Sequence, residues 1–259
     1  MSMPQKMRRN HQMKGTSGCR RWVRPQGSLE LKQGEIHLWR ADLDRHMDSL
    51  PVLEQTLDAG EREKAGEFHS EADRNRFILA RAILRTILAK YLNTQPGQLT
   101  FCYGPQGKPE LAGGSVRFNV SHSDGLALYA ISGVHDVGVD VERVRPGVEE
   151  DVAGWLFPLR AIRFLEALPQ PARRHAFFQG WARMEAYQKA RGEGLALSFE
   201  NFETFLHQRD LVLFGPREDL GEAAQWWLHG FFPRRGYVAA LAARGHKCRL
   251  RYWRWHASN

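Results

Sequence analysis

The pattern of hydrophobic and polar positions predicts a chain in which strands and helices alternate. Residues 35–39 alternate as a strand does, and residues 50–92 carry a helical pattern with a break near His69 and Ser70. Ser70 is placed to cap the helix that follows. Within that helix, apolar residues recur every three or four positions and predict its buried face: Phe77, Ala80, Leu84, Leu88 and Tyr91.

Beyond residue 96 the pattern becomes mostly extended. Glycine and proline over 96–114 predict turns, and a hairpin follows, with strands at 116–120 and 126–131 joined by a polar turn at 121–125. The hairpin leads into an acidic strand at 137–142, where valines alternate with other residues. The remaining patterns predict helices near 149–167 and 172–191, and strands at 236–242 and 249–253.

Length and composition fit a globular protein with a full core. At 259 residues and 42% hydrophobic content, one domain and two small halves are both open. No apolar run approaches the roughly 18 residues of a membrane span, and no signal peptide is recognisable. The three cysteines, Cys19, Cys102 and Cys248, are widely spaced and odd in number. This usage favours a reduced compartment, so we expect a cytoplasmic protein with no membrane association.

The net charge of +8 belongs to the two ends of the chain. Residues 1–27 hold seven Lys and Arg with no acid, and so do residues 223–259, which leaves the part between them acidic. Because the first segment also has little apolar content, we expect a disordered basic tail over residues 1–28. An inert tail is a simpler explanation than contact with nucleic acid or acidic lipid.

Two acidic segments about forty residues apart carry the candidate chemistry. On a strand, Asp140 and Glu142 project from one face about 7 Å apart. On a helix, Glu185 and Lys189 stand at i and i+4 and share one side. Three carboxylates and a lysine suit a divalent cation bound to a phosphate ester, because Mg²⁺ takes few protein oxygens and completes its shell with phosphate and water.

Each feature alone also has an ordinary structural explanation. Asp140 and Glu142 fit the solvated face of an edge strand, Glu185 and Lys189 fit a surface ion pair, and His122 fits a polar turn. Three arginines at helical spacing fit a solvated helix face: Arg74, Arg81 and Arg85.

The order of four motifs favours function over these explanations. They are Gly107-Lys108-Pro109, Phe118-Asn119-Val120-Ser121-His122-Ser123, Gly138-Val139-Asp140-Val141-Glu142 and Trp181-x-x-Met184-Glu185-Ala186-x-x-Lys189. In this order and within about ninety residues they resemble the 4′-phosphopantetheinyl transferases of the Sfp type. The resemblance extends over about residues 30–245 and does not account for either end of the chain.

The resemblance implies a fold and an activity. The fold is α+β, a pseudo-twofold arrangement of two similar halves, each a small mainly antiparallel sheet packed with helices. We therefore expect an N-terminal half at 29–132 and a C-terminal half at 133–259. The implied enzyme moves phosphopantetheine from coenzyme A, with Mg²⁺, to a serine of an acyl or peptidyl carrier protein and releases adenosine 3′,5′-bisphosphate. By the same resemblance we expect a monomer.

The resemblance also implies the roles of individual residues. Asp140, Glu142 and Glu185 match metal ligands, and Lys189 matches a lysine on the pyrophosphate. Glu185 is the candidate base for the attacking serine, directly or through a metal-bound water, because a serine hydroxyl is a weak nucleophile at its ordinary pKa. Residues that match contacts to the nucleotide and its phosphates are Arg62, Lys64, Arg76, Lys108, Ser121 and His122.

Two departures from the family pattern stand close to these motifs. Met184 occupies a position that is a lysine in many relatives, so a positive charge near the phosphates is missing in this interpretation. Ala161 occupies a position that is often a glutamate, so an auxiliary acid is absent.

Two other functions remain open at this stage. One is a catalytically weak relative that only binds coenzyme A or a carrier protein. The other is a nucleic-acid-binding protein that uses its basic ends and the aromatic and arginine residues of 251–256, but we do not expect nucleic acid to be the main partner. The pathway of the carrier protein is not set by these residues.

Overall fold

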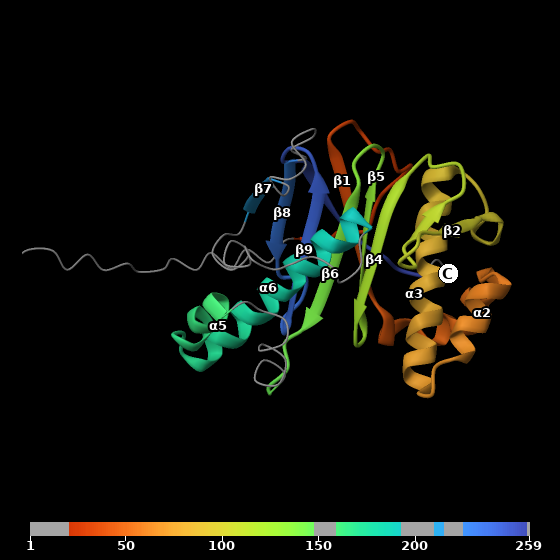
Figure 1. The fold of residues 1–259 in the computed structure, drawn as a ribbon. Helices are drawn as coiled ribbons and strands as arrows, with labels where there is room; N and C mark the ends of the chain where they lie inside the picture. Colours follow the sequence, from red (N-terminus) through yellow and green to blue (C-terminus); the bar gives the residue numbers. More distant parts are fainter. Residues whose placement is uncertain (1–20, 148–158, 193–209, 215–224, 258–259) are drawn as a thin grey trace, which may run out of the picture.

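The computed structural model describes residues 21–147, 159–192, 210–214 and 225–257. Within these ranges the strands form two four-stranded sheets and one short hairpin (Figure 1). The first sheet has the order β10-β1-β5-β4, formed by β10 (Arg249–Arg254), β1 (Glu35–Asp42), β5 (Leu126–Ser132) and β4 (Arg117–Ser123). The second has the order β6-β9-β8-β7, formed by β6 (Val137–Arg143), β9 (Tyr237–Arg244), β8 (Gln225–Phe231) and β7 (Asp210–Phe214). The hairpin pairs β2 (Phe101–Tyr103) with β3 (Pro109–Leu111).

Each large sheet carries one long helix. These are α3 (Glu71–Leu92) and α6 (Gln170–Arg191), and Figure 1 shows α6 lying across β6 and β9. Ser70 caps α3 by accepting a hydrogen bond from the backbone of Asp73, as the sequence predicts. The shorter helices are η1 (Leu43–Ser49), α1 (Leu50–Leu53), η2 (Glu54–Thr56), α2 (Ala59–Gly66), η3 (Pro96–Gln98) and α5 (Leu159–Glu166).

Strand alternation divides the apolar residues among three layers of core. Ile36 and Leu128 point toward the other sheet and meet Val139 and Leu241 there, whereas neighbouring residues on the same strands point outward to α3 or α6. The two sheets therefore pack face to face, with α3 outside one and α6 outside the other. The predicted α+β fold of two similar halves is confirmed.

Most predicted elements are found, with shifted ends. The hairpin turn is shorter than predicted: residues 121–123 belong to β4, and the turn is Asp124-Gly125, where Asp124 has φ of +48°. Of the helix predicted near 149–167, residues 148–158 lie outside the described ranges, and α5 begins at Leu159.

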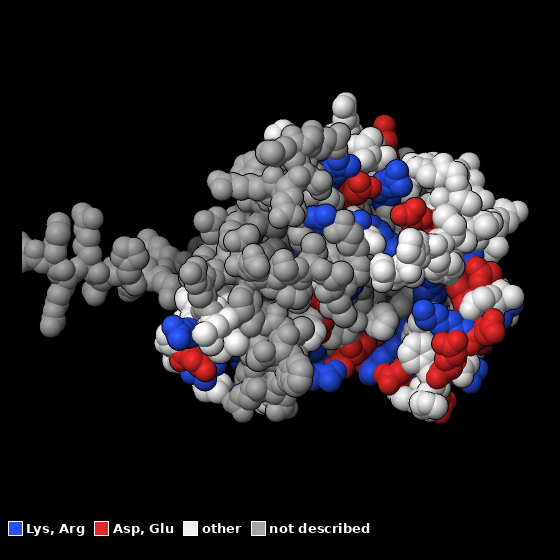
Figure 2. All heavy atoms as spheres, in the orientation of Figure 1, with Lys and Arg blue, Asp and Glu red and all other residues white. Residues whose placement is uncertain are grey.

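The last strand does not stay with its own half. β10 pairs in parallel with β1, so the segment after β9 returns to the first sheet and crosses the boundary expected at 132/133. Arg251 of β10 pairs with Glu35 of β1, and Arg234, which precedes β9, pairs with Asp42 of β1. On the face drawn in Figure 2, basic and acidic side chains accordingly lie interspersed on the described surface.

The predicted tail includes ordered residues. Residues 1–20 lie outside the described ranges, but Val23 bridges Trp253, and Trp22 packs edge-on against Tyr252 at 5.1 Å between ring centroids. The prediction of a disordered tail is therefore wrong around Trp22 and Val23. The backbone of Val23 forms hydrogen bonds with β10, and the Trp22 ring packs against the hydrophobic core.

The predicted basic face of α3 is largely buried. Arg85 is 0% exposed and donates from Nε to Glu61 Oε2 at 2.6 Å, and Arg81 donates to Glu61 Oε1 at 2.7 Å. The ordinary explanation of a solvated helix face does not hold for these two residues, because α2 places a buried carboxylate over α3. None of the helices in the described ranges is long and apolar enough to cross a bilayer.

Candidate functional site

The candidate site lies where β4, at the edge of the first sheet, runs beside β6, at the edge of the second. We call this boundary between β4 and β6 the seam. Along it, backbone N–H groups of β6 donate to side chains of β4 and not to its backbone carbonyls. The backbone N–H of Val139 donates to Asn119 Oδ1 at 2.9 Å, and the N–H of Val141 donates to Ser121 Oγ at 3.3 Å. The N–H of Arg143 donates to Ser123 Oγ at 3.1 Å in the same way. Residues 119, 121 and 123 share one face of β4, so their period of two matches that of β6 and fixes the register of the seam.

Asp140 is the buried centre of the site. Its side chain is almost completely enclosed, and its Oδ1 accepts hydrogen bonds from Ser121 Oγ at 2.9 Å and from Lys189 Nζ at 2.5 Å. Lys189 Nζ also donates to Ser121 Oγ at 3.3 Å. The structure thus brings β6, α6 and the Phe118–Ser123 motif together at Asp140.

A glycine allows α6 to approach β6 this closely. A Cβ on Gly138 would lie 2.0 Å from the carbonyl oxygen of Ala186 and 2.4 Å from the nitrogen of Ala190. Both atoms are backbone atoms of α6, so the helix rests directly on the strand at this residue. The close approach brings Lys189 into contact with Asp140 and places Glu185 within electrostatic reach of it.

Three acidic groups and one lysine influence each other's ionisation here. Burial raises the pKa of Glu185, with Lys189 opposing and Asp140 reinforcing the increase. Burial lowers the pKa of Lys189, but its ion pair and hydrogen bond with Asp140 outweigh burial, and the net pKa is raised. The ammonium therefore stays charged beside the carboxylate.

Glu142 stands at the solvent end of the same strand face. It accepts a hydrogen bond from Ser123 Oγ at 3.2 Å. Burial and then the charge of Asp140 raise the pKa of Glu142 to about 8, against the opposing effects of Lys189 and Ser123. In the ligand-free protein this carboxyl is therefore protonated at neutral pH.

The pKa of Glu142 predicts how stability changes with pH. Between the unfolded value of 4.5 and about 8, folding takes up a proton at Glu142, so stability falls as pH rises. With metal ions chelated, the free energy of unfolding should fall by up to about 1.4 kcal/mol per pH unit more steeply in the wild type than in Glu142→Gln. Urea unfolding at several pH values between 5 and 8 measures this, and parallel profiles for the two proteins would contradict it.

The oxygen atoms of the site partly fit the Mg²⁺ that the resemblance implies. Asp140 Oδ2 is buried and accepts no hydrogen bond from any described residue, which is the state of a carboxylate oxygen that awaits a ligand. Within the described ranges, however, no three His, Cys, Asp or Glu side chains converge closely enough to hold a metal ion. The ammonium of Lys189 is bound to Asp140 instead.

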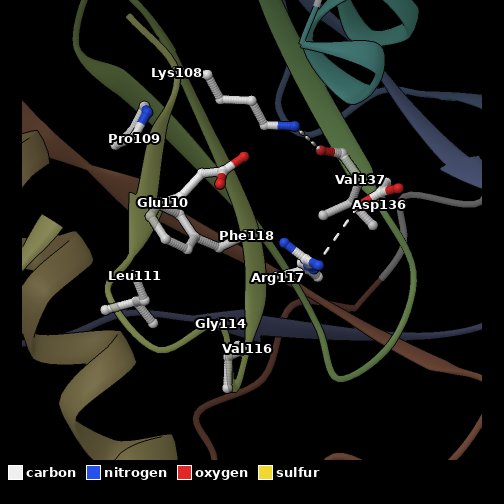
Figure 3. A pocket seen from close by; sticks show the side chains of 10 residues that line it. All are labelled: Lys108, Pro109, Glu110, Leu111, Gly114, Val116, Arg117, Phe118, Asp136 and Val137. Atoms are coloured by element: carbon white, nitrogen blue, oxygen red, sulfur yellow. Dashed lines mark hydrogen bonds and ion pairs between the residues drawn. The ribbon is translucent and has the colours of Figure 1, made fainter. Parts of the chain in front are cut away.

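Lys108 reaches the site region from the first half of the chain. It lies next to β3, and its Nζ donates to the carbonyl of Ala190 at 3.2 Å and to that of Val137 at 3.5 Å. Figure 3 shows the side chain extended along a cavity toward Val137, with Arg117 and Asp136 forming an ion pair across the other side. Burial lowers the pKa of Lys108. The lysine thus links the β2–β3 hairpin to the end of α6.

Arg76 and His122 lie at the same end of the first half. Arg76 on α3 donates from Nε to Asp44 Oδ1 at 3.0 Å. His122 projects from the face of β4 opposite to Ser121 and reaches solvent. Burial by the surrounding residues and then the charge of Lys189 lower the pKa of His122, and Arg76 acts in the same direction, so both cations lie within electrostatic reach of it.

Arg62 and Lys64 stand apart from the other predicted residues. Both side chains are exposed on α2, and Arg62 donates to the carbonyl of Gln55 at 3.3 Å. No contact in the described ranges joins either of them to the seam. Their binding to the nucleotide stays a prediction.

The two departures in the sequence lie in the hydrophobic core. Met184 is 1% exposed and packs with Trp226 and Val238, and Ala161 is fully buried where α5 meets α6. Met184 thus belongs to the apolar core between α6 and the second sheet, and the missing positive charge near the phosphates stays a prediction.

Sequence reasoning assigned no role to Asn119, Ser123 or Gly138. The signal for the first two is the alternation of polar residues at 119, 121 and 123 in phase with the acidic strand. For Gly138, the signal is a glycine inside an otherwise apolar strand, which often marks a close approach of another backbone.

Comparison with known proteins agrees with this geometry. Residues 136–242 match the 4′-phosphopantetheinyl transferase superfamily, and residues 41–133 match the N-terminal region of 4′-phosphopantetheinyl transferases. The chain is 36% identical over 241 residues to the 4′-phosphopantetheinyl transferase HetI of Nostoc sp., covering 90% of this chain and 98% of the relative. It is 27% identical over 173 residues to gsp of Aneurinibacillus migulanus (67% of this chain, 71% of the relative). It is 26% identical over 148 residues to Sfp of Bacillus subtilis (57% and 65%). The chain therefore belongs to the 4′-phosphopantetheinyl transferase superfamily and is a transferase of the two-domain Sfp type.

Proposed function

We propose that this enzyme transfers the 4′-phosphopantetheine group of coenzyme A to a serine of an apo acyl or peptidyl carrier protein, with release of adenosine 3′,5′-bisphosphate. The observation that carries the proposal is the contact of Lys189 of α6 with Asp140 at the seam between the two halves, where Glu185 also lies within electrostatic reach of both residues. Because one chain supplies both sides of this seam, we propose that it acts as a monomer. We also propose that it acts in the cytoplasm.

Carboxylates on two elements are suited to hold Mg²⁺ in this reaction. Asp140 and Glu142 share one face of β6, and Glu185 on α6 lies within electrostatic reach of both; we propose these three as the ligands. The buried Oδ2 of Asp140, which accepts no hydrogen bond from the described residues, supports this assignment. The cation would neutralise charge on the diphosphate of coenzyme A and on the phosphate that leaves.

Glu185 is the proposed base for the serine hydroxyl. Its pKa is raised by burial, which strengthens its affinity for a proton, and its side chain is half-buried beside Lys189. Lys189 in turn is proposed to bind the diphosphate, since an ammonium on the same helix face stabilises the negative charge that develops there.

Basic and polar side chains around the seam are proposed to bind the nucleotide. Lys108 reaches α6 from the hairpin, and His122 and Arg76 lie at the end of β4 and on α3. Ser121 is the one member of the proposed set that already bonds both Asp140 and Lys189. Arg62 and Lys64 complete the proposed set from α2.

Intact-mass spectrometry tests the transfer. An apo carrier protein incubated with the enzyme, coenzyme A and Mg²⁺ should gain the mass of one phosphopantetheine. Glu185→Ala should reduce the initial rate about 10³-fold, since general-base and metal-ligand roles are lost together. Glu166→Ala on the exposed side of α5 is the matched control and should keep the wild-type rate.

The carriers should include fatty-acid, polyketide and peptide-synthetase types. A protein that binds coenzyme A but modifies none of them would be a catalytically weak relative, and the proposed function would be wrong. Full activity in Glu185→Ala would leave the transfer in place and remove Glu185 from its proposed role.

A further inference from the structure

Lys189 binds the same carboxylate that the proposed cation requires. Its Nζ lies 2.5 Å from Asp140 Oδ1 and 3.3 Å from Ser121 Oγ. Asp140 is 2% exposed, so in the ligand-free protein the lysine is a charge-balancing partner for a carboxylate that has almost no access to water. The sequence alone does not distinguish this ion pair from an exposed lysine that becomes paired only when a phosphate binds.

One carboxylate oxygen is engaged and the other is not. Oδ1 accepts from both Ser121 and Lys189, whereas Oδ2 accepts no hydrogen bond within the described ranges. A divalent cation on Oδ2 would stand within a few ångströms of the ammonium, since the two oxygens belong to one carboxylate. Like charges that close repel strongly in a partly desolvated site, so the cation and the ammonium compete for Asp140.

The lysine is also able to leave. Its side chain is 31% exposed and rises from the helix face that borders the seam, so the ammonium can exchange Asp140 for an anion that arrives from solvent. A diphosphate is such an anion, because its oxygens offer the ammonium new charged acceptors.

We propose that Lys189 couples the entry of the cation to the entry of coenzyme A: it occupies Asp140 until the diphosphate draws it away, and only then does the carboxylate accept the cation. The inference rests on the proposed function and concerns how the same site is loaded. Lys189 acts here as a positioning residue that blocks a bare metal site in the absence of substrate. The expected consequence is strong cooperativity between the cation and coenzyme A.

Binding of Mn²⁺, measured by the electron paramagnetic resonance signal of the free ion, tests this without any carrier protein. In wild type, coenzyme A should tighten Mn²⁺ binding at least tenfold. In Lys189→Met, which keeps the length of the side chain and removes its charge, Mn²⁺ without coenzyme A should bind at least tenfold more tightly than in wild type. Arg191→Met, a cation on the same helix that donates to Tyr187, is the control and should bind Mn²⁺ as wild type does.

The inference is overturned if Lys189→Met binds Mn²⁺ within threefold of wild type in the absence of coenzyme A. It is equally overturned if coenzyme A leaves Mn²⁺ binding to the wild type unchanged. Lys189→Gln serves as the second variant if the methionine variant does not fold. Because no step requires a carrier protein, a wild type that shows the coupling but makes no holo carrier would refute the proposed transfer and leave the role of Lys189 intact.

Discussion

Replacing Gly138 with alanine is expected to destabilise the protein by about 3 kcal/mol and to slow phosphopantetheine transfer on the order of 100-fold. The new Cβ would stand 2.0 Å from the carbonyl oxygen of Ala186 and 2.4 Å from the nitrogen of Ala190. These are backbone atoms in the C-terminal part of α6, so no side chain can move aside, and this part of the helix must lift from β6. Alanine normally gains in backbone entropy over glycine in a strand, but that gain is only about 0.5–1 kcal/mol and the clash outweighs it.

Lifting α6 also separates the two parts of the site. Glu185 and Lys189 ride on the helix, while Asp140 stays on the strand, and displacements of about 1 Å at reacting groups cost about two orders of magnitude in rate. Urea unfolding and initial transfer rates measure the two effects. Gly133→Ala is the matched control: no described atom lies within 4 Å of its added Cβ, so the change should stay within about 0.5 kcal/mol. Wild-type stability in Gly138→Ala would refute the direct contact between α6 and β6.

Sequence periodicity predicted the parts of the fold that depend on one element at a time. The alternation at 137–142 placed Asp140 and Glu142 on one strand face, and the spacing of Glu185 and Lys189 placed them on one helix side. Both arrangements are present, because a strand has a period of two and a helix of 3.6 residues whatever surrounds them.

Periodicity did not predict the contacts between elements that are distant in the sequence. The pairing of β10 with β1 joins segments about two hundred residues apart, and no local pattern distinguishes the edge of one sheet from that of another. A solvated position is the usual one for an arginine, and only the placement of Glu61 over α3 accounts for the burial of Arg85.

The candidate site divides in the same way. The residue types and their order identified the family, and the comparisons agree. The state of the site was not predictable, because the ion pair between Lys189 and Asp140 depends on how closely Gly138 lets α6 approach. The alignment of Asn119, Ser121 and Ser123 with β6 likewise required the position of two sheets relative to one another.

Replacing Asp140 with asparagine is expected to reduce transfer about 10³-fold while the fold is retained. Asparagine has nearly the shape of aspartate, so the packing of the buried side chain and the bond to Ser121 can persist. What is lost is the negative charge that binds Lys189 in the free enzyme and that we propose binds the cation in the complex. The loss should therefore appear in the initial rate at saturating coenzyme A and Mg²⁺, measured by intact mass of the carrier protein.

Asp136→Asn separates this effect from a general change of charge. Asp136 lies just before β6, is 40% exposed, and pairs with Arg117 and Arg244 at 3.8 and 3.9 Å. Its loss removes the same formal charge from the same half of the protein, and surface pairs of this length contribute no more than about 1 kcal/mol, so the rate should stay within about threefold of wild type. If Asp140→Asn kept more than a tenth of the wild-type rate, the carboxylate at the centre of the seam would not be part of the reacting site. Equal losses in both variants would instead point to long-range attraction of substrate by charge, an effect that rising salt concentration would abolish.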